Sequence, residues 1–460
     1  MYTMSSEKEM TPARVKRYLD AHAAQEARCV KLQKYYKGEH TAILNRTFED
    51  ETKPNNRIVN PYAQYITDIM SGYFMGEAVT YSCADEAQLD ELKQVLTYND
   101  EAAENSELAT AASINGMAYE LLYIDDDGML RFKSIDPAKA IPIYDNTIEQ
   151  ELLYFIRYYD ENDIESNQTT RFVEVYSREN VVKYQLISGT LSHIETLEHA
   201  FGMVPVCVYL NNSNAQGDFE TSISLIDAYD RAQSDMVNDQ DYFSDAYMTL
   251  TGAEGTDESQ ITAMKTNRVL LLPQGVSAGW LTKADTTSTG ESILTRIDNS
   301  IHKFSKCPAM TDKDFAGNSS GVAMRYKLMG LEDATAKKER EFKRGLQRRL
   351  ELIFGVIGVI GRAYDWRAVN ITFNRNIPSN LDEAADTVNK IGDLISKEAR
   401  VNLLPIDIDY AEDLEKQKQE AVSGYSEYRY SGVLEEESGE QPQQSGEDSG
   451  DVQSRAKGNV

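Results

Sequence analysis

A long stretch without proline constrains the fold of this chain more than any other feature of its sequence. It follows a turn rich in glycine, asparagine and serine, residues 314–321, and continues to Gly361. Ser319 or Ser320 can serve as the N-cap of a helix, because a serine hydroxyl accepts the free amide protons of the first turn. At about 1.5 Å per residue, such a helix spans roughly 50 Å. The sequence therefore predicts a rod that crosses several layers of a larger object.

Apolar and charged residues divide this rod into three sections. Met324, Leu328 and Leu331 recur at helical spacing and predict a buried face at its start. Residues 337–344 are charged almost all round, and residues 350–360 are nearly all apolar. The apolar section is too short for a membrane span, which needs about twenty residues. We therefore interpret it as part of a protein core.

The charge of the chain limits what it can bind. Its 460 residues suffice for about two to four domains, and its formal net charge is -28. General affinity for nucleic acid comes from Lys and Arg side chains that release counterions from phosphates, so this charge argues against a protein that grips DNA. An acidic wall repels phosphates, and it suits a protein past which DNA must slide.

The cysteines and the N-terminus indicate a reduced, intracellular protein. Cys29, Cys83, Cys207 and Cys307 lie far apart and form no CxxC pair, so we interpret them as buried thiols rather than zinc ligands or a disulfide framework. The first residues lack the basic segment and apolar core of a signal peptide. We therefore expect the protein to stay in the cytoplasm of the cell that makes it.

Sequence motifs of common enzyme classes are missing. The chain contains no GxxxxGKS/T phosphate loop, no HExxH pair and no GxSxG nucleophile turn. Its five histidines stand in unrelated contexts and are expected at the surface or in packing, and its carboxylates are too scattered for a catalytic dyad to stand out. We expect no enzymatic activity, no cofactor and no metal site. A nuclease is the enzymatic alternative.

Helices are predicted in the first part of the chain. The helix at 11–37 has Thr11 as N-cap and Pro12 at its first position. A second helix is opened by Asn60 and Pro61, and further helices are expected at 86–98 and 101–115. The buried side of the first helix is expected to hold Val15, Leu19, Ala23, Ala27 and Val30.

An antiparallel sheet is predicted next. Residues 118–124 and 129–133 form a hairpin whose Asp-Gly tip favours a tight turn. The acidic residues of this tip do not have EF-hand spacing, so we interpret it as a structural turn rather than a calcium site. Further strands are expected at 152–159, 171–176, 180–187 and 204–210.

A helix over residues 221–250 carries a heptad stripe, which predicts a coiled-coil or bundle seam. The stripe consists of Ile226, Tyr229, Gln233, Met236, Gln240, Phe243, Tyr247 and Leu250. Its two polar members, Gln233 and Gln240, favour register-setting contacts between neighbours. A compact insert follows at 252–285, with a short helix at 258–265, and it is too small to have much core of its own.

The remaining elements surround the rod. A helix that begins at the capping box 288–291 is expected to bury Ile293, Ile297, Ile301 and Phe304. After the rod, a strand at 369–374 is expected to return to the earlier sheet, and helical segments follow at 381–396 and 411–428. From residue 435 the chain is acidic and rich in Gly, Ser and Gln, which predicts disorder.

Two stretches of the chain resemble the signatures of a known family. Residues 315–332 read FAGNSSGVAMRYKLMGLE, and residues 55–66 read NNRIVNPYAQYI, followed by GYFMG at 72–76. Both resemble the portal proteins of tailed (siphovirus-type) bacteriophages, in particular those of phages of Gram-positive bacteria, and the resemblance covers about residues 55–434. It implies an α+β portal-protein fold, with a wing of helices and antiparallel sheet, a helical stem, a small α/β clip and a helical crown, assembled as a closed ring.

The same resemblance implies an order of regions along the chain. These are an N-terminal helical arm (1–54), the wing (55–220), a stem helix (221–250), the clip (251–286), a second stem helix (287–305), a tunnel loop (306–320), the long helix with a returning wing strand (321–378), the crown (379–434) and a disordered acidic tail (435–460).

The resemblance also implies functional residues. A tunnel loop lines the narrowest part of the channel, where lysines would contact phosphates transiently and aspartates would keep that contact weak. Its residues would be Lys306, Asp312, Lys313, Asp314, Phe315, Gly317 and Asn318. The alternative for this loop is a solvated connection between two helices. The clip residues that would dock partners are Glu258, Lys265, Arg268, Gln274 and Trp280.

Seven cations of the rod have two interpretations. Glutamates are interleaved with them, so they can form surface ion pairs that face solvent or a neighbouring subunit. The other interpretation is a stripe that faces DNA. Alternating signs cancel a strong field toward phosphate, which favours contacts between subunits. The cations are Lys337, Lys338, Arg340, Lys343, Arg344, Arg348 and Arg349.

The implied function is mechanical. A homo-oligomeric ring, a dodecamer by the resemblance, would form a channel at one capsid vertex for packaging, retaining and ejecting double-stranded DNA without sequence specificity. The terminase large subunit would dock on the clip, followed by head-completion (adaptor) and tail proteins, and the major capsid and scaffolding proteins would be further partners. The ring would assemble in the host bacterial cytoplasm, enter the virion and contact no membrane. The alternative is a capsid-associated scaffold or minor head protein without a channel.

Overall fold

A computed structural model describes residues 2–50, 53–165, 167–244, 247–251, 277–281, 287–310, 321–375, 388–391 and 400. The chain divides into two units, Met1–Asn376 and Ile377–Val460. All helices and strands named below belong to the first unit, which contains both helices and sheets. The predicted α+β class is therefore confirmed. The predicted crown lies almost wholly, and the acidic tail wholly, outside the described residues.

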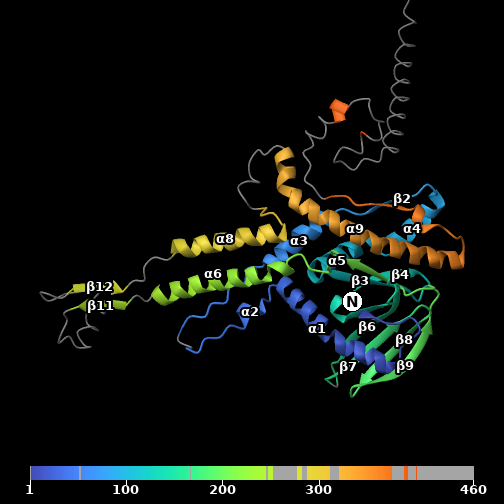
Figure 1. The fold of residues 1–460 in the computed structure, drawn as a ribbon, viewed down its shortest axis with the longest axis horizontal. Coiled ribbons are helices and arrows are strands. Elements are labelled where there is room, and N and C mark those ends of the chain that lie inside the picture. The colour runs from blue at the N-terminus through green and yellow to red at the C-terminus, as the bar shows by residue number, and fades with distance from the viewer. Residues whose placement is uncertain are drawn as a thin grey trace, which may run out of the picture. The chain divides into compact units, whose positions relative to one another are not determined.

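The largest sheet has six strands, and helix α1 packs against it (Figure 1). Neighbouring strands are antiparallel except β1 and β5, which are parallel. Val15 of α1 is fully buried against Ile141, Ile156 and Val173 of the sheet. In spatial order the strands are β1 (Tyr2–Thr3), β5 (Ala140–Tyr144), β6 (Leu152–Asp163), β7 (Gln168–Tyr176), β8 (Asn180–Ile187) and β9 (Thr190–Glu198).

The buried side of α1 (Pro12–Tyr36) differs from the prediction. Ala23, Ala27 and Val30 are exposed. A polar residue, His22, lies among the buried residues of this side. Its Nε2 atom lies 3.2 Å from the carbonyl oxygen of Ala138. The buried residues are Val15, His22, Cys29, Leu32 and Tyr35.

A second sheet, in the order β10-β3-β4, packs against α5 and the long helix α9 on one face and against the six-stranded sheet on the other (Figure 1). Its hairpin of β3 (Met117–Ile124) and β4 (Leu130–Ile135) confirms the predicted one, and Gly128 at the tip has φ 76. Strand β10 (Val206–Leu210) pairs with β3. Gly116 ends α5 (Glu101–Asn115) at φ 83, and a Cβ there would lie 2.1 Å from a backbone oxygen, so only glycine fits.

Helix α9 (Gly321–Ile360) confirms the predicted rod, with 40 residues in one helix. Its apolar end is core, since Leu350, Leu352 and Ile353 are almost completely buried. The segment after it returns beside α4 (Glu86–Tyr98), where Tyr364 donates a hydrogen bond to Glu91.

The strand after α9 joins a different sheet from the predicted one. Strand β13 (Asn370–Thr372) pairs with β2 (Thr80–Ser82) in a separate two-stranded sheet. The reason is geometric, because the chain leaving α9 runs beside α4, and β2 lies directly before α4 in the sequence.

Three short 3-10 turns complete the described fold: η1 (Pro137–Lys139), η2 (Glu220–Ser222) and η3 (Trp366–Ala368). Helix α4 begins where predicted, with the Asp85 side chain accepting from the amides of Ala87 and Gln88. In the part of the chain that the structure describes, no helix is long and apolar enough to cross a membrane.

Candidate functional site

Two antiparallel helices carry a small sheet at one end, and we call this group the helical hairpin. Helices α6 (Ile223–Ser244) and α8 (Thr287–Ser305) run side by side and lead to strands β11 (Tyr247–Thr251) and β12 (Ser277–Leu281) (Figure 1). The strands pair antiparallel, with Tyr247 opposite Leu281. The helices touch closely, since a Cβ added to Gly290 of α8 would lie 2.9 Å from the sulfur of Met236 of α6.

Both helices differ in extent from the prediction. The helix predicted to reach residue 250 ends at Ser244, and Tyr247 and Leu250 belong to β11. The sequence Tyr-Met-Thr-Leu-Thr has strong strand propensity, and pairing with β12 satisfies its backbone. Helix α8 begins at Thr287, so the predicted capping residue, Ser288, already lies within the helix.

The face that α8 buries is narrower than predicted. Ile301 is fully buried and Ile297 is partly buried. In contrast, Ile293 is 49% and Phe304 is 59% exposed. Two of the four apolar side chains predicted to be buried therefore face outward in the single chain.

A buried carboxylate, Asp230 of α6, anchors the base of the helical hairpin. It accepts hydrogen bonds from the backbone amide and the side-chain amide of Asn60, at 2.8 and 2.9 Å. Its other oxygen lies 2.5 Å from Nδ1 of His40, whose Nε2 lies 3.2 Å from the carbonyl of Tyr35. Because both residues are fully buried, these contacts hold α6 against two segments that are more than 150 positions away in sequence.

The same face of α6 binds an extended segment, residues 56–60. The amide of Ile58 donates to Ser234, and the amide of Asn56 donates to Asn238 at 2.7 Å. Together with Asp230, these α6 positions are spaced by four residues and so lie on one helix face. The side chain of Asn56 also donates to Asp241 at 2.6 Å.

These contacts give a structural role to the NNRIVN stretch. Its asparagines bind α6, a pairing that the sequence does not reveal because the partners are far apart. Asn60 does not cap the next helix as predicted. Helix α3 (Tyr62–Met75) is preceded by Pro61 as its capping residue, and Gly76 ends it. The short helix α2 (Thr41–Leu44) lies between α1 and α3.

The chain that leaves α8 is fixed against α3. Tyr62 donates to Asp298 at 2.6 Å, and Tyr65 donates to the carbonyl of Pro308 while accepting from the amide of Met310. Burial raises the pKa of the Cys307 thiol to about 12, so this cysteine stays protonated and is not a nucleophile near neutral pH.

The predicted tunnel-loop residues begin at this point. Lys306 directly follows α8, is exposed and adopts a left-handed backbone conformation, with φ 61. The other predicted residues of this loop lie outside the described part of the chain, namely Asp312, Lys313, Asp314, Phe315, Gly317 and Asn318.

One predicted clip residue is described. Trp280 lies in β12, opposite Met248 of β11. Helix α8 has 19 residues, so Lys306 and Trp280 are separated by a helix on the order of 28 Å long. Glu258, Lys265, Arg268 and Gln274 lie outside the described residues.

Two cations of α9 are buried inside the chain, contrary to the predicted surface stripe. Lys338 forms an ion pair with Asp218. Arg349 is fully buried and donates to both oxygens of Glu120, at 2.7 and 2.9 Å, and to Glu101 at 3.2 Å. These residues are buried because α9 passes between elements of the core, so their charged groups are not part of the surface of the chain.

Other charged residues of α9 form the expected ion pairs along the helix. Arg344 pairs with Glu341, and Arg348 pairs with Glu351. Among the described residues, no group of three or more His, Cys, Asp or Glu side chains is arranged to hold a metal ion.

Comparisons with known proteins give one family. Residues 15–424 match the family model described as phage portal protein, SPP1 Gp6-like. The portal protein of Clostridium phage phiCD119 is 25% identical over 405 residues, which cover 82% of this chain and 89% of that protein. The portal protein of Bacillus phage SPP1 is 23% identical over 419 residues, covering 85% of this chain and 81% of that protein.

Solved structures give weaker similarities. A chain in the neck of an empty gene transfer agent particle, computed with C6 symmetry, has a TM-score of 0.45 at 11% identity and covers 76% of this chain and 91% of that chain. A chain in the neck of the native particle, computed with C12 symmetry, has a TM-score of 0.45 at 10% identity, covering 76% and 90%.

Proposed function

The chain belongs to the SPP1 Gp6-like family of phage portal proteins, and from this premise we propose that its copies form a closed ring around a DNA channel. As a portal protein it is a structural component of the phage-type virion head, at the capsid vertex. The helical hairpin is the observation that carries the proposal. It joins a small sheet at one end to the residues before a glycine-rich loop at the other.

We assign the regions of the chain from this hairpin outward. Helices α6 and α8 form the stem, and residues 251–286 between them form the clip. Residues 1–54 form the N-terminal arm, residues 55–220 form the wing, and residues 306–320 form the tunnel loop. Residues 379–434 form the crown. The wing assignment is supported by the anchoring of both stem helices to α3 and its preceding segment through Asp230, Asp298 and their partners.

Exposed apolar side chains support assembly of the ring. Besides Ile293 and Phe304 of α8, Tyr326 at the start of α9 is 74% exposed, and Met329 is also exposed. Large apolar side chains left in water at neighbouring elements are typical of a surface that another protein covers. We propose that another copy covers them through head-to-tail contacts, which close into a ring when the rotation between copies is a whole fraction of a turn. By the family resemblance the ring has twelve subunits.

The charge of the stem suits a channel that releases DNA easily. Besides the buried Asp230, helix α6 contains Asp227, Asp235, Asp239 and Asp241 but only one cation, Arg231. Carboxylates repel phosphate, so the stem would offer few strong contacts to the duplex. Lys306 and Lys313 would provide brief phosphate contacts, weakened by Asp312 and Asp314 beside the second lysine.

The proposed clip is the docking site of the motor and then of the tail. The terminase large subunit would pump DNA through the ring while bound to Glu258, Lys265, Arg268, Gln274 and Trp280. Head-completion (adaptor) and tail proteins would later bind the same surface, and the wing would contact the major capsid and scaffolding proteins. Assembly would take place in the host bacterial cytoplasm.

A deletion in the proposed tunnel loop tests its role. Removing residues 312–318 should leave ring formation intact, because the stem and wing contacts described above do not involve them. Packaging of DNA, or its retention after packaging, should fall strongly when phage carrying the deletion are assayed for nuclease-protected DNA. The matched control removes residues 441–447, an equally long piece of the acidic tail. Normal packaging by rings with the shortened loop would exclude the tunnel-loop assignment.

A further inference from the structure

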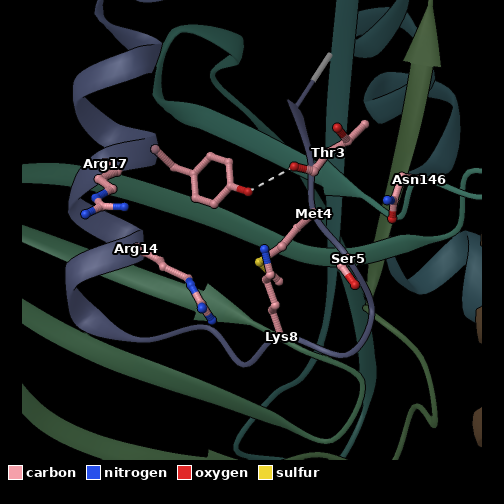
Figure 2. Close-up of a pocket in the computed structure, with 8 residues that line it drawn as sticks. Thr3, Met4, Ser5, Lys8, Arg14, Arg17 and Asn146 are labelled. Atoms are coloured by element: carbon pink, nitrogen blue, oxygen red, sulfur yellow. Dashed lines mark hydrogen bonds between the residues drawn. The ribbon is translucent and has the colours of Figure 1, made fainter.

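A basic cavity lies where the N-terminal arm meets the six-stranded sheet, away from the helical hairpin. It has a volume of about 340 Å³ and opens between the N-terminal segment, the first turns of α1 and the turn after β5 (Figure 2). Three cationic side chains line it together with hydroxyl and amide groups, and none of the residues that line it is acidic. The polar lining residues used below are Thr3, Ser5, Lys8, Arg14, Arg17 and Asn146.

The three cations make no ion pair with any acidic side chain that the structure describes. Arg14 donates to the backbone carbonyl of Glu9, a neutral acceptor. On the same helix, in contrast, Lys16 points elsewhere and pairs with Asp20 at 2.6 Å. The chain has 75 acidic and 47 basic residues, so partners for cations are abundant. A cavity that gathers three cations without a carboxylate therefore departs from the general character of this protein.

The position of the two arginines makes their grouping costly for the helix. Arg14 and Arg17 lie in the first two turns of α1, and the first turn contains no acidic residue. The first turn of a helix carries a partial positive charge, so a cation placed there, such as Arg14, is unfavourable. Helix stability thus does not explain these residues. A bound anion would convert the same arrangement into a favourable one.

We propose that this cavity binds a carboxylate-rich peptide segment of a partner protein. Arginine guanidinium groups present parallel N–H donors that match the two oxygens of a carboxylate. The arginines come from α1, while Lys8, Thr3 and Ser5 come from the segment before it, so two segments of the chain supply the polar lining (Figure 2). The residues that line the site belong to neither the proposed stem nor the proposed tunnel loop, so the proposal does not rest on the ring.

The surroundings of the cavity favour a peptide over a nucleic acid. Glu7, Glu9 and Asp20 are exposed and flank the cationic residues in sequence. A nucleic acid carries a charge at every nucleotide, so its neighbouring phosphates would meet these carboxylates. A peptide can place its carboxylates at the cavity and neutral residues beside it. Charge complementarity therefore selects a short, discontinuous run of acidic side chains.

The proposal is tested by fluorescence anisotropy with the full-length protein. The probe is a labelled octapeptide in which Glu alternates with Gly, and the reference peptide has Gln in place of Glu. The variants are Arg14→Gln and Arg17→Gln, with Lys16→Gln as the matched control that removes the same charge from the same helix. Each arginine variant should weaken binding of the Glu peptide about three- to tenfold, and K16Q should change it less than twofold.

Three outcomes would overturn the proposal. They are equal binding of the Glu and Gln peptides, equal losses in R17Q and K16Q, or displacement of the peptide by an oligonucleotide at a lower concentration than by unlabelled Glu peptide. The last outcome would identify a nucleic-acid site. Arg17 is exposed and pairs with no described acidic residue, so R17Q should unfold at the wild-type temperature. Lys8→Gln, in the segment before the helix, is an independent variant that should also weaken binding.

Discussion

At the scale of single residues, one carboxylate fixes the base of the helical hairpin. Asp230 is fully buried and accepts from both amide groups of Asn60, while its second oxygen faces His40. A buried charged group of this kind is stable only while its donors remain, because water cannot replace them. The position of the hairpin therefore depends on a few polar contacts as well as on apolar packing.

Replacing Asp230 should be far more harmful than replacing its exposed neighbour. The D230N variant keeps the size of the side chain, but its amide NH2 group would face N–H groups that now donate to the carboxylate. It should therefore lower the free energy of unfolding by about 2–4 kcal/mol. Asp235 is 55% exposed and pairs with Arg46, so D235N should cost less than about 1 kcal/mol. Urea denaturation measures both. Similar losses for the two variants would disprove the anchoring role.

Arg349 provides a second test at this scale. Its guanidinium lies between Glu120 and Glu101 in the core, and R349M would leave two buried carboxylates without their cation. We expect a loss of about 3–5 kcal/mol in unfolding free energy. Arg344 is 75% exposed, and R344M should change stability by less than about 0.5 kcal/mol. A loss below about 1 kcal/mol for R349M would show that the buried pair is dispensable.

These residues also show where sequence reasoning ends. Lys338 and Arg349 belong to an alternating charge pattern that is the same whether the charges are exposed or buried. Their partners Asp218 and Glu120 lie 120 and 229 positions away, so no local spacing reveals them. Ala23 and Ala27 were placed on the wrong side of α1 because alanine is compatible with either environment. Burial of single residues is decided by tertiary contacts.

At the scale of elements, α9 is one uninterrupted helix whose glycines have different roles. Gly345 faces Tyr209 of β10, and a Cβ there would lie 2.3 Å from the tyrosine ring. Tyr209 is fully buried and its hydroxyl donates to Glu120, so the ring has little freedom to move. Gly355 is exposed, and an added Cβ would meet nothing within 4 Å.

Two alanine substitutions in α9 should therefore have opposite signs. G345A should destabilise the protein by about 1–3 kcal/mol, because the clash outweighs the better helix propensity of alanine. G355A should stabilise it by up to about 1 kcal/mol, since only propensity changes. Thermal unfolding of G345A, G355A and the wild-type protein in one buffer measures the two changes in stability. A stabilised G345A would mean that α9 does not pack against β10 as described.

Elements with strong local signals could be predicted, and those set by partners could not. The helices at 86–98 and 101–115 match the predicted bounds, because the Asp85 side chain caps the first and Gly116 ends the second. Strand β9 was missed because eight of its nine residues are exposed, so it lacks the alternation that marks a half-buried strand. The end of α6 was overextended because strand pairing of residues 247–251 depends on β12, about thirty positions later.

At the scale of the whole molecule, family membership could be recognised from two motifs, but an assembly cannot be derived from one chain. The NNRIVN stretch binds α6, so the structure gives a physical role to this motif. Contacts between copies involve surfaces that look merely exposed in one copy, such as Phe304 and Tyr326.

Electron microscopy of the purified full-length protein, with class averaging and native mass, tests the central claim most directly. The account predicts closed rings of uniform size with a central hole wide enough for a DNA duplex, and twelve copies in each. Monomers or irregular aggregates, across a range of salt and protein concentrations, would contradict the channel. That result would instead support a capsid-associated scaffold or minor head protein.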